Sequence, residues 1–201
     1  VLCISKSGET METLAQFLAI LEWLPSYENI RCITQPGEST LRKIASQYDI
    51  KIYDHPPHIG GRFSVFTLTG LIPMHLNNMD VENFLKGAKQ ALTHPPEVFT
   101  SPQHVLWIYS QRLRPIAQWW AQLVAESLGK KDKKGKRYGV TPLVSFGTQD
   151  QHSQLQYYLD GPLDKSFTFL CDAKASTPPL KGIQQSYLVG KTMGDIYEAH
   201  Q

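Results

Sequence analysis

A turn rich in hydroxyl groups joins an apolar segment to a helical one near the start of the chain. The turn reads Ser5-Lys6-Ser7-Gly8-Glu9-Thr10, and it lies between Val1-Leu2-Cys3-Ile4 and an expected helix over residues 12–24. Free backbone N–H groups and the positive end of the helix dipole converge at such a junction, and the Ser, Thr and Lys side chains add donors. The turn therefore predicts a phosphate site. The alternative is that its hydroxyls only cap the helix.

Three other residues have side chains suited to catalysis. Arg62 follows Gly60-Gly61, where the backbone can approach a ligand while the guanidinium reaches an oxyanion; the alternative is a surface ion pair. Glu126 ends an expected helix whose last turn should favour cations, so it is either functional or paired with Lys130. His152 lies in a polar loop, where it is either an acid or base near neutral pH or a surface histidine.

The elements that must position these residues alternate between strand and helix. Strands are expected over residues 1–4, 30–33, 51–53, 105–109, 143–146 and 167–171, and helices over 12–24, 39–48, 64–76, 81–92, 114–128 and 151–159. Such alternation predicts parallel sheets with helices on their faces. Pro95-Pro96 marks a boundary, so we expect two α/β units over residues 1–95 and 96–201. In open α/β sheets ligands bind at the carboxyl ends of the strands, so function is expected in the loops there.

Composition excludes several other classes of protein. A formal net charge of +2 is too small for a nucleic-acid surface, and the basic run at residues 130–137 has no interleaved aromatic side chain, so a solvated loop is expected. No apolar run approaches the ~20 residues of a membrane span. The three cysteines, Cys3, Cys32 and Cys171, lack metal-ligand spacing, which indicates reduced thiols, no metal site and a cytoplasmic protein.

Four motifs occur in an order that resembles the glucose-6-phosphate isomerase family. They are the turn with the residues after it (5–13), Gly60-Gly61-Arg62-Phe63-Ser64-Val65 with 70–73, Glu126-Ser127-Leu128-Gly129-Lys130, and 150–156 with 160–162. The chain looks like the middle portion of a bacterial type of this enzyme. The resemblance implies two sugar isomerase (SIS) domains, each a three-layer αβα sandwich around a parallel sheet. Residues 1–95 would be the C-terminal part of the first domain and 96–201 the N-terminal part of the second, both incomplete.

The resemblance also implies a reaction. It is the reversible conversion of glucose 6-phosphate to fructose 6-phosphate through a cis-enediol, in glycolysis and gluconeogenesis, by a homodimer with shared active sites and without a metal or organic cofactor. Ser5, Lys6, Ser7 and Thr10 match the phosphate-binding turn. Arg62 matches the arginine that stabilises the enediolate, Glu126 the base that moves a proton between C1 and C2, and His152 the histidine that helps to open the sugar ring.

Two segments of the family's active site have no counterpart in this chain. An upstream phosphate loop and a C-terminal region with an active-site lysine and glutamine are absent from residues 1–201, so we expect this chain alone to be inactive. Lys191 is not taken for that lysine. Two alternatives stay open at this point: a non-catalytic SIS-domain sensor of sugar phosphates, and a related isomerase that also acts on mannose 6-phosphate.

Overall fold

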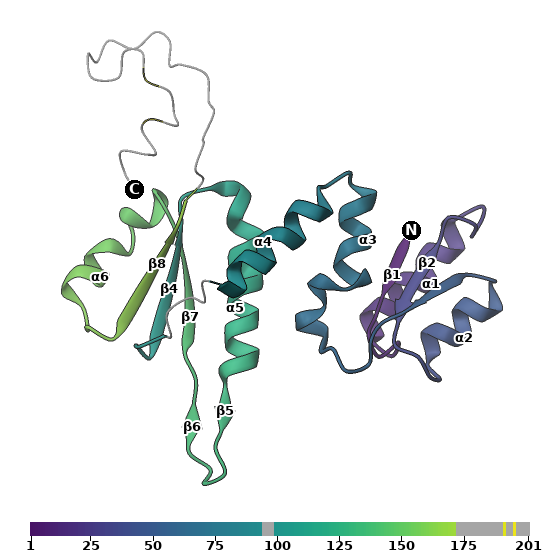
Figure 1. Ribbon diagram of the computed structural model, residues 1–201, viewed down its shortest axis with the longest axis horizontal. Coiled ribbons are helices and arrows are strands. Elements are labelled where there is room, and N and C mark those ends of the chain that lie inside the picture. The colour runs from purple at the N-terminus through teal and green to yellow at the C-terminus, as the bar shows by residue number, and fades with distance from the viewer. Residues whose placement is uncertain (94–98, 172–190, 192–194, 196–201) are drawn as a thin grey trace. The chain divides into compact units, whose positions relative to one another are not determined.

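A computed structural model describes residues 1–93, 99–171, 191 and 195 (Figure 1). The chain divides into two compact units, Val1–Pro96 and Glu97–Gln201. The expected boundary between residues 95 and 96 lies outside the described residues, as does most of the segment after 171. No helix in the described part has the length and apolar character needed to cross a membrane.

The first unit contains three strands and four α-helices in the order β1 (Leu2–Ile4), α1 (Met11–Trp23), β2 (Arg31–Thr34), α2 (Thr40–Gln47), β3 (Lys51–Asp54), the 3-10 helix η1 (Gly61–Phe66), α3 (Leu68–Leu76) and α4 (Val81–Thr93). The strands pair in parallel in the order β1-β2-β3. Their three carboxyl ends therefore lie at one edge of the sheet.

Helices cover both faces of this sheet. Cys3 and Cys32 pair in register and face α1 and α2, where they join one apolar core. Ile4 and Ile33 point to the opposite face, since strand side chains alternate, and there they share a cavity with Ser64 of η1 and Thr69 of α3. The unit is thus a three-layer sandwich. The buried members of the first core are Cys3, Phe17, Leu21, Ile30, Cys32, Leu41, Ala45 and Ile50.

The second unit is built in the same way. Its elements are β4 (Gln103–Ile108), the 3-10 helix η2 (Gln111–Leu113), α5 (Arg114–Leu128), β5 (Lys130–Lys131), β6 (Arg137–Tyr138), β7 (Thr141–Phe146), the 3-10 helix η3 (Gln149–Gln151), α6 (Leu155–Asp160) and β8 (Lys165–Leu170). Strands β7, β4 and β8 form a parallel sheet in that order. Ala117 of α5 packs on Leu106 and Ile108, whereas Tyr158 of α6 contacts Trp107 on the other face, with the ring centroids 5.4 Å apart.

The expected α/β fold with parallel sheets is confirmed, and α5 has the expected bounds. The continuous helix over residues 64–76 was wrong, because Thr67 has an extended backbone and interrupts it between η1 and α3. The Thr67 hydroxyl donates to the Ser64 carbonyl at 2.7 Å and accepts from the Thr69 N–H at 3.3 Å. Its side chain therefore ends one helix and caps the next.

The basic segment is exposed, as expected of a solvated loop, but β5 and β6 at its two ends pair as an antiparallel hairpin. The Asp132 carboxylate accepts the N–H groups of Lys134 and Lys136 at 2.8 and 2.9 Å and so stabilises the turn between them. One other expectation is corrected. The helix expected over 151–159 is replaced by η3 and the shorter α6. The Asp150 side chain accepts from the Phe146 N–H and from the Ser153 hydroxyl, and these bonds favour a tight turn there.

The turn after β1 has no room for a side chain at Gly8. Its φ is +69°, and a Cβ at this position would lie 2.3 Å from Ser39 Oγ, whereas Gly37, with φ +105°, has open space around it. Both Gly→Ala changes introduce backbone strain, but only Gly8→Ala adds a clash. We expect Gly8→Ala to lower the free energy of unfolding by about 1–3 kcal/mol more than Gly37→Ala, measured by urea unfolding. Equal losses would contradict the close packing of Gly8 on Ser39.

Candidate functional site

Ser5 closes the turn between β1 and α1. Its N–H donates to the Ile33 carbonyl at 3.1 Å, which extends the pairing of β1 with β2 by one residue. Its buried hydroxyl accepts from the Gly8 N–H at 3.1 Å and lies 2.9 Å from Thr10 Oγ1. The Ser5 side chain therefore holds the turn together from inside, and the outward-facing donors are those of its neighbours.

Thr10 does not act as a side-chain cap. It occupies the N-cap position of α1, but its hydroxyl makes no capping hydrogen bond, so the helix-capping interpretation is wrong for this residue. The first N–H groups of a helix have no intrahelical partner, and here they remain for another acceptor. Ser7 and Thr10 are exposed beside them. The geometry of the turn suits an anion at the positive end of α1.

The acidic side chain of the turn is directed to a different helix. Glu9 Oε1 accepts from the Thr40 N–H at 2.6 Å, and Oε2 accepts from the Thr40 hydroxyl at 2.7 Å. Both bonds lower the pKa of Glu9, and the bond from the Thr40 backbone has the larger effect. The carboxylate thus stabilises the N-terminus of α2, where Ser39 also accepts from the Arg42 N–H at 3.3 Å.

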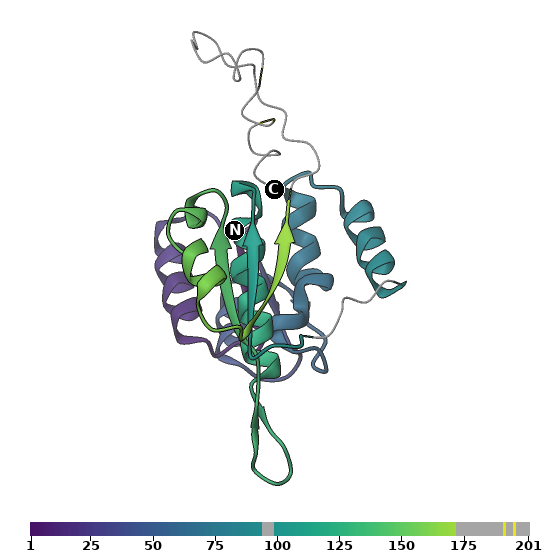
Figure 2. The same cartoon turned by 90° about the vertical axis from the view of Figure 1, so that its left-hand side faces the viewer.

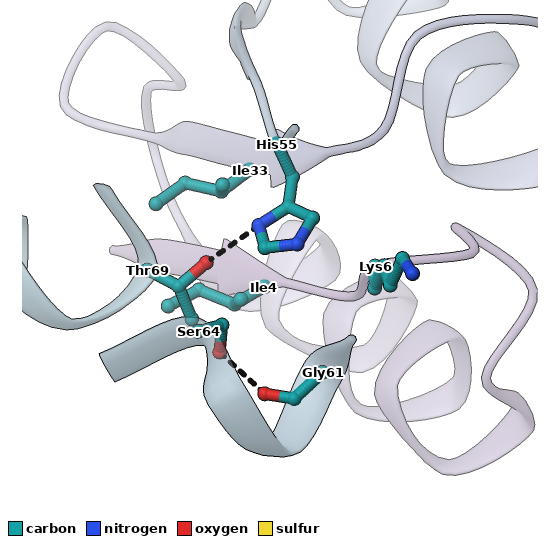
Figure 3. Close-up of a pocket in the computed structure, with 7 residues that line it drawn as sticks. All are labelled: Ile4, Lys6, Ile33, His55, Gly61, Ser64 and Thr69. Atoms are coloured by element: carbon teal, nitrogen blue, oxygen red, sulfur yellow. Dashed lines mark hydrogen bonds between the residues drawn. The ribbon is translucent and has the colours of Figure 1, made fainter. Parts of the chain in front are cut away.

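A cavity of about 180 Å³ brings two of the predicted motifs together (Figure 3). Lys6, from the turn after β1, and Gly61, beside Arg62, both line it. The other lining residues come from the same sheet edge and from the helical layer over it: Ile4, Ile33, His55, Ser64 and Thr69. The guanidinium carbon of Arg62 lies 4.7 Å from the Phe63 ring centroid. The phosphate turn and the Gly60-Gly61-Arg62 segment therefore approach one edge of the first sheet.

His55 is the residue of this cavity that the sequence reasoning missed. It follows β3 directly, and only 2% of its surface is exposed. In the sequence it stands before Pro56-Pro57 in a run of turn-forming residues, which predicts an exposed loop. The available signal was its position, since a polar residue at the carboxyl end of a parallel strand lies where ligands bind.

Glu126 lies in the last turn of α5 and is exposed in this chain. The Gln122 amide approaches Glu126 Oε2 at 3.5 Å from one turn earlier in the helix. A carboxylate so placed accepts hydrogen bonds without being buried, and it can take up a proton from a ligand that reaches it.

His152 lies between η3 and α6 and is also exposed. The loop that carries it is fixed by Asp150, which is only 8% exposed. Asp150 Oδ2 accepts from the Phe146 N–H at 2.6 Å, and Oδ1 accepts from the Ser153 hydroxyl at 2.8 Å. The backbone on each side of His152 is therefore tied to the carboxyl end of β7.

Glu126 lies just before the β5-β6 hairpin, which extends from the amino ends of the strands of the second sheet (Figure 2). His152 follows β7 and so lies at the carboxyl ends of these strands, the opposite edge of the sheet. The start of α5 is at the carboxyl edge, because the Arg114 guanidinium lies 4.0 Å from the ring centroid of Phe146, the last residue of β7. Its end is at the amino edge, where a Cβ at Gly139, just before β7, would lie 3.4 Å from Gly129 Cα. At 1.5 Å per residue, Glu126 lies about 18 Å along the helix axis from Arg114. A hexose phosphate is much shorter than this.

The predicted site residues therefore lie close together in the first unit but not in the second. The first brings Lys6 and Gly61 to one cavity, whereas the second keeps Glu126 apart from His152. Within residues 1–93 and 99–171, no three His, Cys, Asp or Glu side chains gather as ligands of a metal ion would. The ligand chemistry that the described geometry suits is that of an anion.

Comparison with known proteins finds relatives named glucose-6-phosphate isomerase. No protein-family model matches the chain. Glucose-6-phosphate isomerase from Thermus thermophilus is 34% identical over 98% of this chain and 54% of its own length. A protein from Haloarcula marismortui named probable glucose-6-phosphate isomerase is 35% identical over 98% of this chain and 50% of its own length. The chain thus spans about half the length of the curated relatives it matches.

Solved structures agree with these relatives. A hypothetical protein from Thermus thermophilus superposes with a TM-score of 0.86 at 32% identity, over 99% of this chain and 55% of that one. A glucose-6-phosphate isomerase from Chlamydia trachomatis has the same fold, with a TM-score of 0.66 at 20% identity over 100% of this chain and 43% of that one. The resemblance expected from the motifs is confirmed, and the chain is homologous to about half of a glucose-6-phosphate isomerase.

Proposed function

We propose that the protein containing this chain is a glucose-6-phosphate isomerase, which interconverts glucose 6-phosphate and fructose 6-phosphate. The observation that carries the proposal is 34% identity over 98% of the chain to a curated isomerase. Support from the structure comes from the anion-binding geometry of the Ser5–Thr10 turn and from the approach of Lys6 and Gly61 to one cavity. Relatives named as isomerases favour catalysis over the alternative of a non-catalytic sensor.

Each proposed residue has a role that its side chain can perform. Of the four turn residues matched to the phosphate site, Lys6, Ser7 and Thr10 contact the phosphate, and Ser5 holds the turn in shape through its buried hydroxyl. The binding energy of the phosphate holds the carbon chain in place. Glu126 transfers the proton between C1 and C2. A carboxylate removes this weakly acidic proton only if the developing oxyanion is stabilised, and the Arg62 guanidinium provides that stabilisation. His152 exchanges protons with the sugar oxygens during ring opening.

The proposed enzyme is a homodimer with composite active sites. Glu126 and His152 lie at opposite edges of one sheet, so the second unit of a single chain does not present both to one hexose phosphate. A partner subunit that contributes its own His152 removes this difficulty. The place of action proposed is the cytoplasm, which the three free cysteines support.

The proposed phosphate contacts predict a binding defect. Ser7→Ala combined with Thr10→Ala in the full-length protein removes two exposed hydroxyl donors, and KM for glucose 6-phosphate should rise on the order of tenfold or more. Ser26→Ala is the matched control, because Ser26 is exposed but precedes β2 and so lies at the other edge of the sheet. An unchanged KM in the double variant would refute the phosphate assignment.

Glu126 predicts a defect in chemistry rather than in binding. Glu126→Gln keeps the shape of the side chain but removes its basicity, so kcat should fall at least roughly a hundredfold while a competitive phosphosugar analogue still binds. Gln118→Ala, an exposed change two turns earlier on α5, serves as the control. Exchange of the C2 hydrogen with solvent, if retained by the Glu126→Gln enzyme, would contradict the role.

The shared site predicts complementation between inactive variants. Full-length His152→Ala and Glu126→Gln subunits, mixed under conditions that allow exchange, should form hybrid dimers in which one of the two sites has both residues. Activity should therefore rise above that of either parent as exchange proceeds. If subunit exchange is demonstrated by mass spectrometry and activity does not rise, the composite site is wrong.

A further inference from the structure

His55 is a buried polar side chain at the carboxyl edge of the first sheet. Its N–H donates to the Thr34 carbonyl at 2.9 Å and so continues the pairing of β3 with β2. The side chain points to the face that carries Ile33, under η1 and α3, and lines the cavity with Lys6 and Gly61. With 2% exposure, the ring has lost its contact with water, and burial without hydrogen bonds would be costly.

Both nitrogens of the ring are satisfied. Nε2 lies 3.1 Å from the Ile59 carbonyl, which only accepts, so Nε2 carries the hydrogen and donates it. In the neutral ring Nδ1 is then an acceptor, and the Thr69 hydroxyl donates to it at 3.3 Å (Figure 3). The imidazole therefore connects the sheet edge, the loop that follows β3 and the first turn of α3.

A second buried side chain holds the other end of the same loop. The Ser64 hydroxyl donates to the Gly61 carbonyl at 2.6 Å, also drawn in Figure 3. The carbonyls on both sides of Gly60 are thus fixed, one by His55 and the other by Ser64. Adjacent glycines lack the steric restriction of a Cβ and lose much conformational entropy when they become ordered. These two hydrogen bonds restrict the backbone from which Arg62 extends.

We propose that His55 is a positioning residue for Arg62: it holds the Ile59 carbonyl and thereby fixes the Gly60-Gly61-Arg62 segment at the sheet edge. The inference rests on the proposed function, in which the Arg62 guanidinium meets charge that develops in the transition state. Preorganised groups of this kind lose effect when they are displaced by even 1 Å. Removal of the His55 ring nitrogens should therefore affect kcat more than KM.

The test compares His55 variants of the full-length protein in the isomerase assay. His55→Leu fills the space without hydrogen bonds, and kcat should fall on the order of tenfold or more while KM changes less than about twofold. In His55→Gln the amide nitrogen can replace Nε2 and reach Ile59, so much of kcat should return. His55→Asn is too short to do so and should resemble His55→Leu. His58→Leu, an exposed change in the same loop, is the control.

A double-mutant cycle separates positioning from general structural damage. If His55 acts through Arg62, His55→Leu should cost little further activity in an Arg62→Ala background. A loss of the same factor in both backgrounds would overturn the inference, as would equal kcat values for His55→Gln and His55→Asn. If His55→Leu does not fold, the inference is tested by comparing kcat of His55→Gln with kcat of His55→Asn.

The outcomes also distinguish the inference from the function on which it rests. A wild-type protein that does not isomerise glucose 6-phosphate would overturn both. An active wild type, with His55→Leu indistinguishable from His58→Leu, would overturn the inference alone and leave the proposed function in place.

Discussion

Parallel strand pairing is the constraint on which the proposed phosphate site depends. Because β1, β2 and β3 run in the same direction, each strand must deliver its following segment to the same edge of the sheet. The Ser5–Thr10 turn and His55 arrive there directly, and the loop after His55 brings Gly60-Gly61-Arg62 back to it. Antiparallel pairing of any one strand would send its segment to the other edge. The side-chain contacts of the proposed phosphate site therefore all depend on this pairing.

The charges at this edge are distributed so that the proposed phosphate would meet donors and not the turn's own carboxylate. Two helices, α1 and α2, begin close to one another, and each has unpaired N–H groups at its start. At the start of α2, the Glu9 carboxylate accepts the Thr40 N–H, the Gly8 carbonyl the Leu41 N–H and the Ser39 hydroxyl the Arg42 N–H. Thr10 leaves the start of α1 without a side-chain cap. The contacts of Glu9 thus keep a negative charge fixed on one helix terminus while the neighbouring terminus remains available to an anion.

The sequence was sufficient for the features that depend on local pattern. The apolar runs predicted every strand of the two parallel sheets to within about two residues, and the bounds of α5 matched in full. Prediction was less successful where a single side chain redirects the backbone. Thr67 and Asp150 interrupt segments whose apolar pattern suits one continuous helix, and Asp132 organises a hairpin within a run of lysines. Each of these three features depends on a side-chain hydrogen bond, which an apolar pattern or a residue composition does not predict.

Burial explains why the candidate site was predicted only in part. The motif residues could be recognised by type and order, but His55 stands before two prolines, where local rules indicate exposure. Its burial arises because α3, more than ten residues later, folds back over the sheet and supplies Thr69. A comparable arrangement exists in the second unit, where the buried Asp150 follows β7 and ties down the loop of His152. In both units a buried polar side chain next to a strand end is stable only with its hydrogen bonds made. The cost of leaving those bonds unmade is what restricts the loops that carry Arg62 and His152 to one conformation.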